Sequence, residues 1–467
     1  MSNETIEFDP VLAPPPVMQS VYGPKTPTQR AADIPGMVSL KVRDLFPEIG
    51  EAIYRDEQDL PKIREATRAA LTNVDMSMIS PTDSINILCS EHGFGIIGGH
   101  AYAEMLRTIR DVIEERTGNP NARLVVIAYV GFKEADEIIE YYDFEAYFQG
   151  KVRGATPFDR GVPIETELGT LYGVANVYNA RWIIHCHYDD PREIYLHRMI
   201  DRSTKPFGMS YARFETRSIF HMTFGKRSGN FVGRAIADSP FVKEKLAFTA
   251  YTLSSPDGIT AVDADNDLHT IGERVTVNVL REYGQMLELF SRIKECIVVM
   301  DGPKWPYYIH AGGMIFGHLF FNGRDWWDID PNVQSSLTES TYPYVNMGIK
   351  ALVINQALIG LFFPLTCPTI AVGEMHEVMR RDFANPTHAS TAMYEPTLAE
   401  AIERAKQLGG TDKIIFFDGT YGSINLSPSL AEELKAQAAG INELIEKERL
   451  PMWLKQRGID PAKHGLA

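Results

Sequence analysis

Short apolar runs alternate along this chain with stretches of helical periodicity, and that alternation limits the folds open to it. Ile85–Ser90 has the sequence INILCS, and after a glycine-rich turn apolar residues recur at helical spacing from Tyr102 to Ile113. Further apolar runs occupy residues 123–130 and 181–187. Strands that are apolar on both faces and alternate with helices form parallel sheets covered by helices on both sides. The sequence therefore predicts an α/β fold with open, mostly parallel sheets.

The second half of the chain repeats this pattern, which predicts a second domain. Further apolar runs occupy residues 295–302, 367–374 and 413–419. Thr397 and Glu400 have the spacing of a capping box at the start of a helix. A chain of 467 residues is also too long for one simple core. We predict an N-terminal α/β domain over residues 51–275, a C-terminal α/β domain over residues 276–467 and a ligand-binding cleft between them.

The first fifty residues differ in composition from the rest of the chain. They hold eight of the 28 prolines and few periodic apolar positions. We predict an extended arm over residues 1–50, either disordered or laid across a partner subunit. The second alternative implies a homo-oligomer held through the arm.

Charge and cysteine usage restrict the partners and the compartment. A net charge of −15 opposes binding to nucleic acid. The four cysteines are far apart and form no C-x-x-C pair, which suits a reducing cytoplasm. The start of the chain lacks a signal peptide, and the most apolar segment, residues 351–367, is interrupted by polar residues and proline. We expect a cytoplasmic enzyme that binds neither nucleic acid nor a membrane.

A glycine-rich turn follows the first apolar strand. GFGIIGG, residues 93–99, matches G-x-G-x-x-G through Gly93, Gly95 and Gly98. Such glycines let backbone N–H groups approach a phosphate at a helix N-terminus. An acidic residue at the end of the second strand, which NAD binding favours, is absent before Glu134. The turn is therefore either a phosphate contact or a plain tight turn, and NAD is the less favoured ligand.

Histidines gather near the end of a predicted strand. His185 and His187 form an H-x-H pair, and His197 and His221 follow within 37 residues. Such a pair at a strand end can converge on a metal ion. Amidohydrolase-type enzymes use it within a closed barrel, but the spacing here does not indicate eight repeats. The alternative interpretation is that these histidines are structural.

Cationic side chains also cluster in this region of an acidic protein. Lys205, Arg213, Arg217 and His221 lie within seventeen residues. Such a group needs anions around it. These are either a bound phosphate or carboxylate, or salt-bridge partners in the chain, for which the candidates are Asp189, Asp190, Glu193 and Glu215.

Taken in order, these blocks resemble the nickel-pincer nucleotide-dependent lactate racemase superfamily. In that family a strand leads through a histidine-bearing loop to a lysine that is covalently bound to the pincer nucleotide, and the nickel-ligating histidine follows about sixteen residues later. Here residues 180–184 resemble the strand, and Lys205 and His221 have the sixteen-residue separation. The loop histidine would be His187 or His197. The resemblance spans roughly residues 80–420 in block order.

Two later blocks are also similar to the family. Residues 245–269 resemble its strand–turn–strand segment, which an acidic residue and a histidine close. Residues 342–352 resemble a helix of the C-terminal domain that carries a substrate-side lysine, here Lys350.

The sequence departs from the family at two positions. Phe132 stands where the family has a second-strand histidine, and residues 90–93 replace its Asp-x-x-Arg. The residues that can substitute for the missing histidine are Lys133, His92 and His100. Both departures indicate a divergent branch with another substrate or without the usual activity.

The resemblance implies an isomerase, a racemase or epimerase of a 2-hydroxy acid or a related sugar acid or polyol. It would work by hydride transfer to and from a nickel-pincer nucleotide, supplied by separate maturation enzymes. The implied site residues are Lys205 for cofactor attachment, His221 for nickel, His187 or His197 with Lys133 for acid/base chemistry, Arg213 and Arg217 for the carboxylate or phosphate, Gly93, Gly95 and Gly98 for the nucleotide phosphate, and Lys350 for substrate.

Two other classes of function remain open from the sequence. One is a metal-dependent hydrolase that uses His185, His187 and His221. The other is a non-catalytic protein that binds an acidic metabolite or nucleotide through the arginines.

Overall fold

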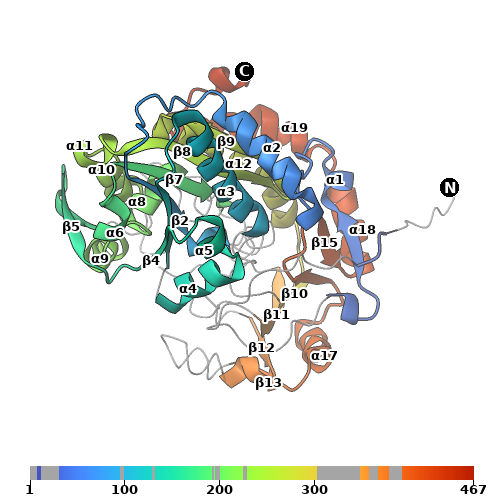
Figure 1. The fold of residues 1–467 in the computed structure, drawn as a ribbon. Coiled ribbons are helices and arrows are strands. Elements are labelled where there is room, and N and C mark those ends of the chain that lie inside the picture. Colours follow the sequence, from blue (N-terminus) through green and yellow to red (C-terminus); the bar gives the residue numbers. More distant parts are fainter. Residues whose placement is uncertain are drawn as a thin grey trace. The chain divides into compact units, whose positions relative to one another are not determined.

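The computed structural model describes the chain in ten segments, residues 8–11, 31–94, 99–128, 132–191, 194, 200–223, 229–301, 348–356, 367–377 and 392–466. The chain divides into two compact units. The central unit comprises Ala52–Ser254 and Gly258–Val279, and the terminal unit comprises Met1–Glu51, Ser255–Asp257 and Leu280–Ala467. Each contains a largely parallel sheet with helices (Figure 1), which confirms the predicted α/β class.

The sheet of the central unit has six strands in the order β4-β3-β2-β7-β8-β9. Its strands are β2 (Ile85–Ser90), β3 (Ala122–Ile127), β4 (Val152–Ala155), β7 (Trp182–Tyr188), β8 (Leu246–Ser255) and β9 (Gly258–Asp265). Strand β2 pairs in parallel with β3 and with β7, and His185 lies opposite Leu88. A separate antiparallel hairpin consists of β5 (Gly161–Thr166) and β6 (Gly169–Val174).

Helices pack on both faces of this sheet because its central strands are apolar on both faces. On one face Leu88 and Ile183 share a core with Phe207 from a short helix after β7. On the other face the Tyr102 hydroxyl donates to the Cys186 carbonyl at 2.8 Å. Tyr102 lies on α3, which packs beside α2 (Figure 1). The helices are α2 (Leu60–Leu71), α3 (Gly99–Thr117), α4 (Phe132–Tyr141), α5 (Phe144–Tyr147), α6 (Ala175–Tyr178), α8 (Lys205–Gly208), α9 (Phe214–Met222), α10 (Arg234–Ala237) and α11 (Pro240–Lys243), with the shorter turns η2 (Glu57–Asp59), η3 (Glu91–Gly93), η4 (Arg202–Thr204) and η6 (Gly229–Gly233).

The sheet of the terminal unit has seven strands in the order β1-β15-β14-β10-β11-β12-β13. Its strands are β1 (Val38–Lys41), β10 (Cys296–Asp301), β11 (Ile349–Gln356), β12 (Thr369–Val372), β13 (Met393–Glu395), β14 (Ile414–Phe417) and β15 (Ser423–Leu426). Its helices and turns are η1 (Ala31–Asp33), α1 (Val42–Leu45), α17 (Leu398–Gly409), α18 (Pro428–Gln437), α19 (Ile441–Leu444), η8 (Ile445–Arg449), α20 (Leu450–Gln456) and η9 (Pro461–His464). The apolar face of α17, with Leu398, Ala401 and Ile402, packs on β10, β11 and β12.

The long helix α12 (Leu268–Ser291) follows the β8–β9 hairpin. The division between the two units falls within this helix, after Val279. Because β8 and β9 are consecutive strands joined by a two-residue connection, they run antiparallel at one edge of the central sheet.

Two predictions about secondary structure are wrong. In the predicted arm, residues 38–41 form the edge strand β1, which pairs antiparallel with β15, and α1 follows it. Residues 12–30 of the arm lie outside the described residues. Lys350 lies on strand β11, not on a helix, because residues 349–354 are almost all apolar and pair with β10 on one side and β12 on the other.

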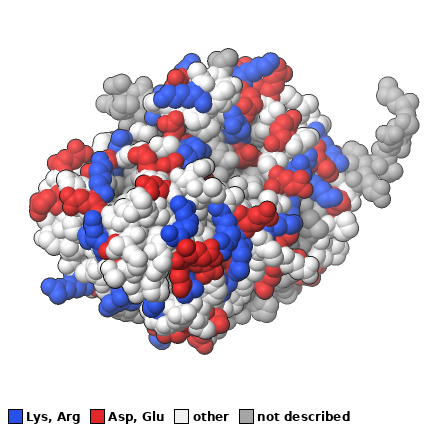
Figure 2. Space-filling model, turned by 45° about the horizontal axis from the view of Figure 1, so that its top comes forward, with Lys and Arg blue, Asp and Glu red and all other residues white. Residues whose placement is uncertain are grey.

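The apolar segment over residues 351–367 begins as the buried part of β11, and residues 357–366 lie outside the described residues. Among the helices that the structure describes, none combines the length and apolarity that a membrane crossing requires. On the face drawn in Figure 2, acidic and basic side chains are intermixed.

Candidate active site

Polar side chains meet at the carboxyl ends of β2 and β7 in the central unit. Ser90 is the last residue of β2, and His187 lies one residue before the end of β7. The two strands run in parallel, so their ends lie at the same edge of the sheet, where open α/β folds bind ligands. The Nε2 atom of His187 is 3.3 Å from the Ser90 hydroxyl oxygen.

Arg202 is the cation next to this pair. Its side chain is 2% exposed, and its Nη2 atom is 3.3 Å from Nδ1 of His187. Its guanidinium also lies 5.7 Å from the centre of the Tyr188 ring. The sequence analysis missed both Ser90 and Arg202. Ser90 could have been noticed as a polar residue at the end of an apolar strand. Arg202 could have been noticed as an arginine three residues before Lys205.

His185 is a core residue. It is fully buried, and its two ring nitrogens contact the hydroxyls of Tyr211 at 2.6 Å and Tyr251 at 3.2 Å. Burial lowers the pKa of His185 to about 3, with a further contribution from the Arg202 charge. His185 is therefore neutral, and each of its nitrogens already has a partner in the core.

Lys205 begins the short helix α8, which is seated on β7. The ring of Phe207 lies 5.4 Å from the ring of His185, measured between centroids. Helix α8 also packs beside η6, since a Cβ atom added to Gly233 would lie 2.5 Å from the Thr204 carbonyl oxygen. Lys205 itself is half-buried. The strand that carries the H-x-H pair therefore also fixes the backbone that carries Lys205.

His221 lies on α9, which packs against α8. Its Nδ1 atom is 2.7 Å from the Arg217 carbonyl oxygen. A carbonyl can only accept, so Nδ1 carries the proton and the lone pair is left on Nε2. His221 is exposed, yet desolvation of its ring lowers its pKa, and the positive charges of Lys205 and Arg217 lower the pKa further. Lys205 and His221 therefore lie on two short helices that contact each other.

The two arginines predicted to hold an anion have partners in the chain. Arg217 donates from Nε to the carbonyl oxygens of Met209 and Ala212, at 2.6 and 3.2 Å. Arg213 forms an ion pair with Glu215 at 2.9 Å, which confirms one of the salt bridges considered from the sequence. These contacts stabilise the turn before α9, and both guanidinium groups bind partners within the chain.

Gly93 and Gly99, the first and last residues of GFGIIGG, are required by packing. A Cβ atom on Gly93 would lie 2.3 Å from the Tyr102 ring, and one on Gly99 would lie 2.3 Å from the Tyr142 hydroxyl. These contacts favour the tight-turn interpretation at both positions. Gly95 and Gly98 lie outside the described residues.

Of the other predicted residues, one lies on α4, one lies outside the described residues and one lies in the terminal unit. Lys133 is exposed in the first turn of α4. His197 lies outside the described residues. Lys350 belongs to the terminal unit, where its Cβ atom would lie 3.0 Å from a Cβ added to Gly409 of α17.

A histidine held between two carboxylates supports the segment before Lys205. Nδ1 of His269 is 2.7 Å from Asp201, and Nε2 is 2.9 Å from Asp238. These contacts, the one with Asp201 above all, raise the pKa of His269 to about 9. A Cβ atom on Gly272 would lie 2.0 Å from Asp201, so only glycine permits this approach to α12. His269 is the histidine that closes the strand–turn–strand block.

A metal site made by side chains alone and a site for a metal-bearing cofactor need different sets of residues. In that part of the chain there is no group of three or more His, Cys, Asp or Glu side chains able to hold a metal ion. A single imidazole of fixed tautomer could supply one ligand to a metal that a cofactor would bring. Nε2 of His221 would be that ligand, because the Arg217 carbonyl holds the ring proton on Nδ1. The Lys205 amine, on the contacting helix α8, would be the attachment point for such a cofactor.

The terminal unit has carboxylates at the point where its strand order reverses. Asp301 ends β10 and Asp418 directly follows β14, and these strands pair in parallel. Asn355 on β11 donates to Asp301 at 3.0 Å. Burial raises the pKa of Asp418. The sequence analysis missed this pair, although both strands end in Asp-Gly.

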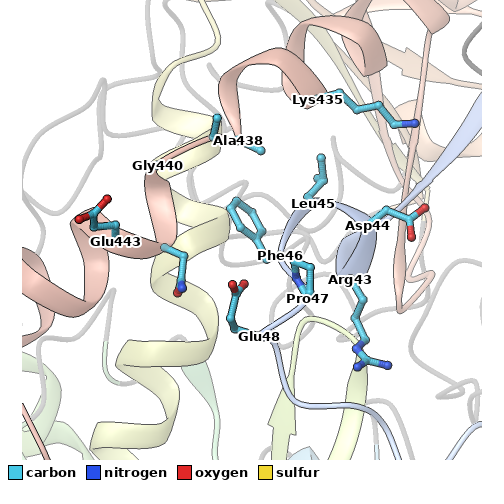
Figure 3. A pocket seen from close by; sticks show the side chains of 12 residues that line it. Arg43, Asp44, Leu45, Phe46, Pro47, Glu48, Lys435, Ala438, Gly440 and Glu443 are labelled. Carbon is cyan, nitrogen blue, oxygen red and sulfur yellow. The ribbon is translucent and has the colours of Figure 1, made fainter. Parts of the chain in front are cut away.

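A hollow of about 910 Å³ also lies in the terminal unit, between α1 with the turn after it and the α18–α19 region (Figure 3). Its lining mixes Arg43 and Lys435 with Asp44, Glu48 and Glu443, so neither sign of charge prevails. It contains none of the residues that the sequence singled out.

No protein-family model matches the chain, and no curated protein matches it either. The functional assignment therefore rests on the side chains of the central unit and their surroundings.

Proposed function

We propose that the chain is an isomerase, a racemase or epimerase, of a 2-hydroxy acid or a related sugar acid or polyol, and that it uses a nickel-pincer nucleotide. The observation that supports this most is the pairing of Lys205 with His221 on packed neighbouring helices. Lys205 begins α8 and His221 lies on α9, and these two helices contact each other. Lys205 and His221 are the two residues that the family resemblance requires, and the Arg217 carbonyl holds the His221 proton on Nδ1, which leaves the lone pair on Nε2.

Lys205 would hold the nucleotide covalently, and His221 would bind the nickel through Nε2. The bound group supplies an acceptor for the hydride of the C–H bond beside the substrate hydroxyl, which avoids forming a carbanion. The chain itself must bind the substrate carboxylate and handle the hydroxyl proton. Arg202 is the buried cation beside His187, and it is our candidate for binding the substrate carboxylate.

The two alternative functions have less support. A hydrolase with His185 as a metal ligand would have to break its contacts with two buried tyrosines. A binding protein that grips its ligand through Arg213 and Arg217 would have to take both from carbonyl and carboxylate partners in the chain. Leaving a buried partner of His185 or Arg217 unpaired would cost about 1–3 kcal/mol, whereas the Arg213–Glu215 pair lies at the surface and is worth about 0–1 kcal/mol.

Intact-mass and metal analysis tests the attachment. The full chain is produced in a host that makes the pincer nucleotide and its maturation enzymes. We expect an added mass and bound nickel in the wild type. Lys205→Ala should lose the added mass, and His221→Ala should keep it but lose nickel. Lys62→Ala, on an exposed lysine paired with Asp59, is the matched control and should keep both. An unmodified wild-type chain from this host would overturn the proposal.

Isotope exchange tests the reaction type. Single enantiomers of several 2-hydroxy acids and sugar acids are incubated with the loaded enzyme in D₂O. Hydride transfer carries the substrate's own hydrogen, so the product should contain no solvent deuterium at the inverted carbon. Deuterium at that carbon would show proton abstraction instead and would contradict the mechanism.

A further inference from the structure

We propose that Arg202 is a positioning residue that fixes His187 as a neutral imidazole with its proton on Nε2, so that His187 is a hydrogen-bond donor and not the base. The substrate part of this inference rests on the proposed isomerase function. The protonation state of the ring does not, because it follows from contacts within the chain.

Two groups that can only donate meet at Nδ1 of His187. The backbone N–H of Tyr188 lies 2.9 Å from Nδ1, and Nη2 of Arg202 lies 3.3 Å from it. Neither a peptide N–H nor a guanidinium can accept a hydrogen bond. Nδ1 must therefore keep its lone pair, and the proton of the neutral ring is on Nε2. That nitrogen faces the Ser90 hydroxyl, which can accept, at 3.3 Å.

The surroundings of the ring oppose a second proton. His187 is 3% exposed, and its ring stacks on Tyr251 with centroids 6.0 Å apart. Protonating Nδ1 would remove the acceptor of two donors and would place a second positive charge against the buried Arg202 guanidinium. The same charge helps to lower the pKa of the neighbouring His185, which shows that it acts on this part of the sheet.

A neutral imidazole that donates through Nε2 has a definite chemical use. By turning this donor from the Ser90 hydroxyl to a substrate oxygen, it can stabilise negative charge that develops there. For a 2-hydroxy acid that oxygen is the hydroxyl oxygen, which becomes the ketone oxygen. The hydroxyl proton must then go to another group. His197 and Lys133 are the sequence candidates for that base.

Nitrogen NMR of the wild-type chain without cofactor tests the protonation state directly. In ¹⁵N-labelled protein, two-bond ¹H–¹⁵N correlations distinguish protonated from unprotonated ring nitrogens, and His187→Gln identifies the His187 signals by their loss. We expect Nδ1 without a proton and Nε2 with one from pH 5 to pH 8. A proton on Nδ1, or a ring that becomes charged within this range, would overturn the proposal. Because no cofactor is present, this result is independent of the isomerase function.

Variants of Arg202 separate positioning from packing. Arg202→Met removes the charge and one of the two donors. Because the Tyr188 N–H still donates to Nδ1, we expect the neutral His187 ring to keep its proton on Nε2, but the ring should become charged between pH 5 and pH 8 once the neighbouring cation is gone. Arg202→Lys keeps a buried cation and should restore the Nε2-protonated, neutral form. A purely structural Arg202 would leave the His187 signals unchanged in Arg202→Met. If neither variant folds, the wild-type spectrum alone decides.

Rate measurements on the loaded enzyme separate a donor from a base. The amide nitrogen of His187→Gln can still donate but cannot take up a proton. We expect kcat to fall about tenfold in His187→Gln and about 10²–10³-fold in His187→Ala, the loss typical of a missing charge-stabilising donor. Equal losses in the two variants would indicate that His187 is the base and would contradict the proposal.

Discussion

Three histidines of the central unit differ in chemistry because their ring nitrogens meet different groups. His185 is sandwiched between two tyrosine hydroxyls and stays neutral in the core. His221 donates a hydrogen bond from its protonated Nδ1 to the Arg217 carbonyl of its own helix and keeps a lone pair on Nε2. His269 lies between two carboxylates and holds its charge. Burial disfavours a charged ring and a carboxylate partner favours it, so the neighbours decide which state each histidine takes.

The contacts of His269 predict a pH-dependent stability. The pKa of His269 is raised to about 9, mainly by Asp201, so the stabilisation is complete below the unfolded value near 6.5 and is lost as the pH rises through 9. Because the side chain is 36% exposed, we expect solvent screening to reduce this to about 1 kcal/mol. Urea unfolding at pH 6.5 and at pH 10 measures the difference. His269→Gln should remove it, and an equal drop in both proteins would argue against the assignment.

The contact between Gly93 and Tyr102 predicts the cost of a side chain at position 93. A Cβ atom there would lie 2.3 Å from a buried ring, so Gly93→Ala should lower the free energy of unfolding by about 1–3 kcal/mol. Tyr102→Leu makes room, and the double variant should therefore lose less than the sum of the two single losses. Denaturant midpoints of the four proteins check this. Strict additivity would mean that the two residues do not compete for space.

At the level of helices and strands, the site depends on a strand that is paired on both sides. Strand β7 pairs in parallel with β2 and with β8. Its last residues are therefore held at the same edge of the sheet as Ser90, the last residue of β2. Short helix α8 then packs on β7 through Phe207. The helix is too short to be stable alone, so its position, and that of Lys205, comes from packing.

The start of α17 predicts a capping effect in the terminal unit. The Thr397 hydroxyl accepts from the Glu400 N–H at 3.3 Å and donates to the Glu400 carboxylate at 2.7 Å, the predicted capping box. Thr397→Ala should cost about 1 kcal/mol of stability, and Thr397→Ser should cost far less because it keeps the hydroxyl. Chemical unfolding of the three proteins measures this. An equal loss in the Ser and Ala variants would exclude capping as the cause.

Each of the two units has its own sheet and its own buried core. The central unit is nearly continuous in sequence, with only Ser255–Asp257 assigned to the terminal unit. The hydrophobic core around β2, β3 and β7 consists of residues between 88 and 268. A domain with a core of this kind can fold alone.

We therefore expect a fragment of residues 52–279 to fold by itself, with one cooperative urea transition. A fragment of residues 52–245 is the matched control, because it lacks β8 and β9 and loses the Tyr251 partner of His185. It should show no cooperative transition. Circular dichroism and tyrosine fluorescence follow both fragments. Failure of the longer fragment would show that the central core needs the rest of the chain.

The sequence by itself determined the α/β class and most of the strands, because runs such as Ile85–Ser90 are apolar on both faces and need a covered sheet. It also singled out the region of the candidate site, since His187, Lys205 and His221 lie within one stretch of the chain. The protonation states, and the roles of Ser90 and Arg202, required the tertiary structure. They depend on contacts between β2, β7 and η4, and a pattern along one chain cannot show which donor lies next to which ring nitrogen. For the same reason the sequence did not predict β1, because β1 pairs along its length with β15, nearly four hundred residues away.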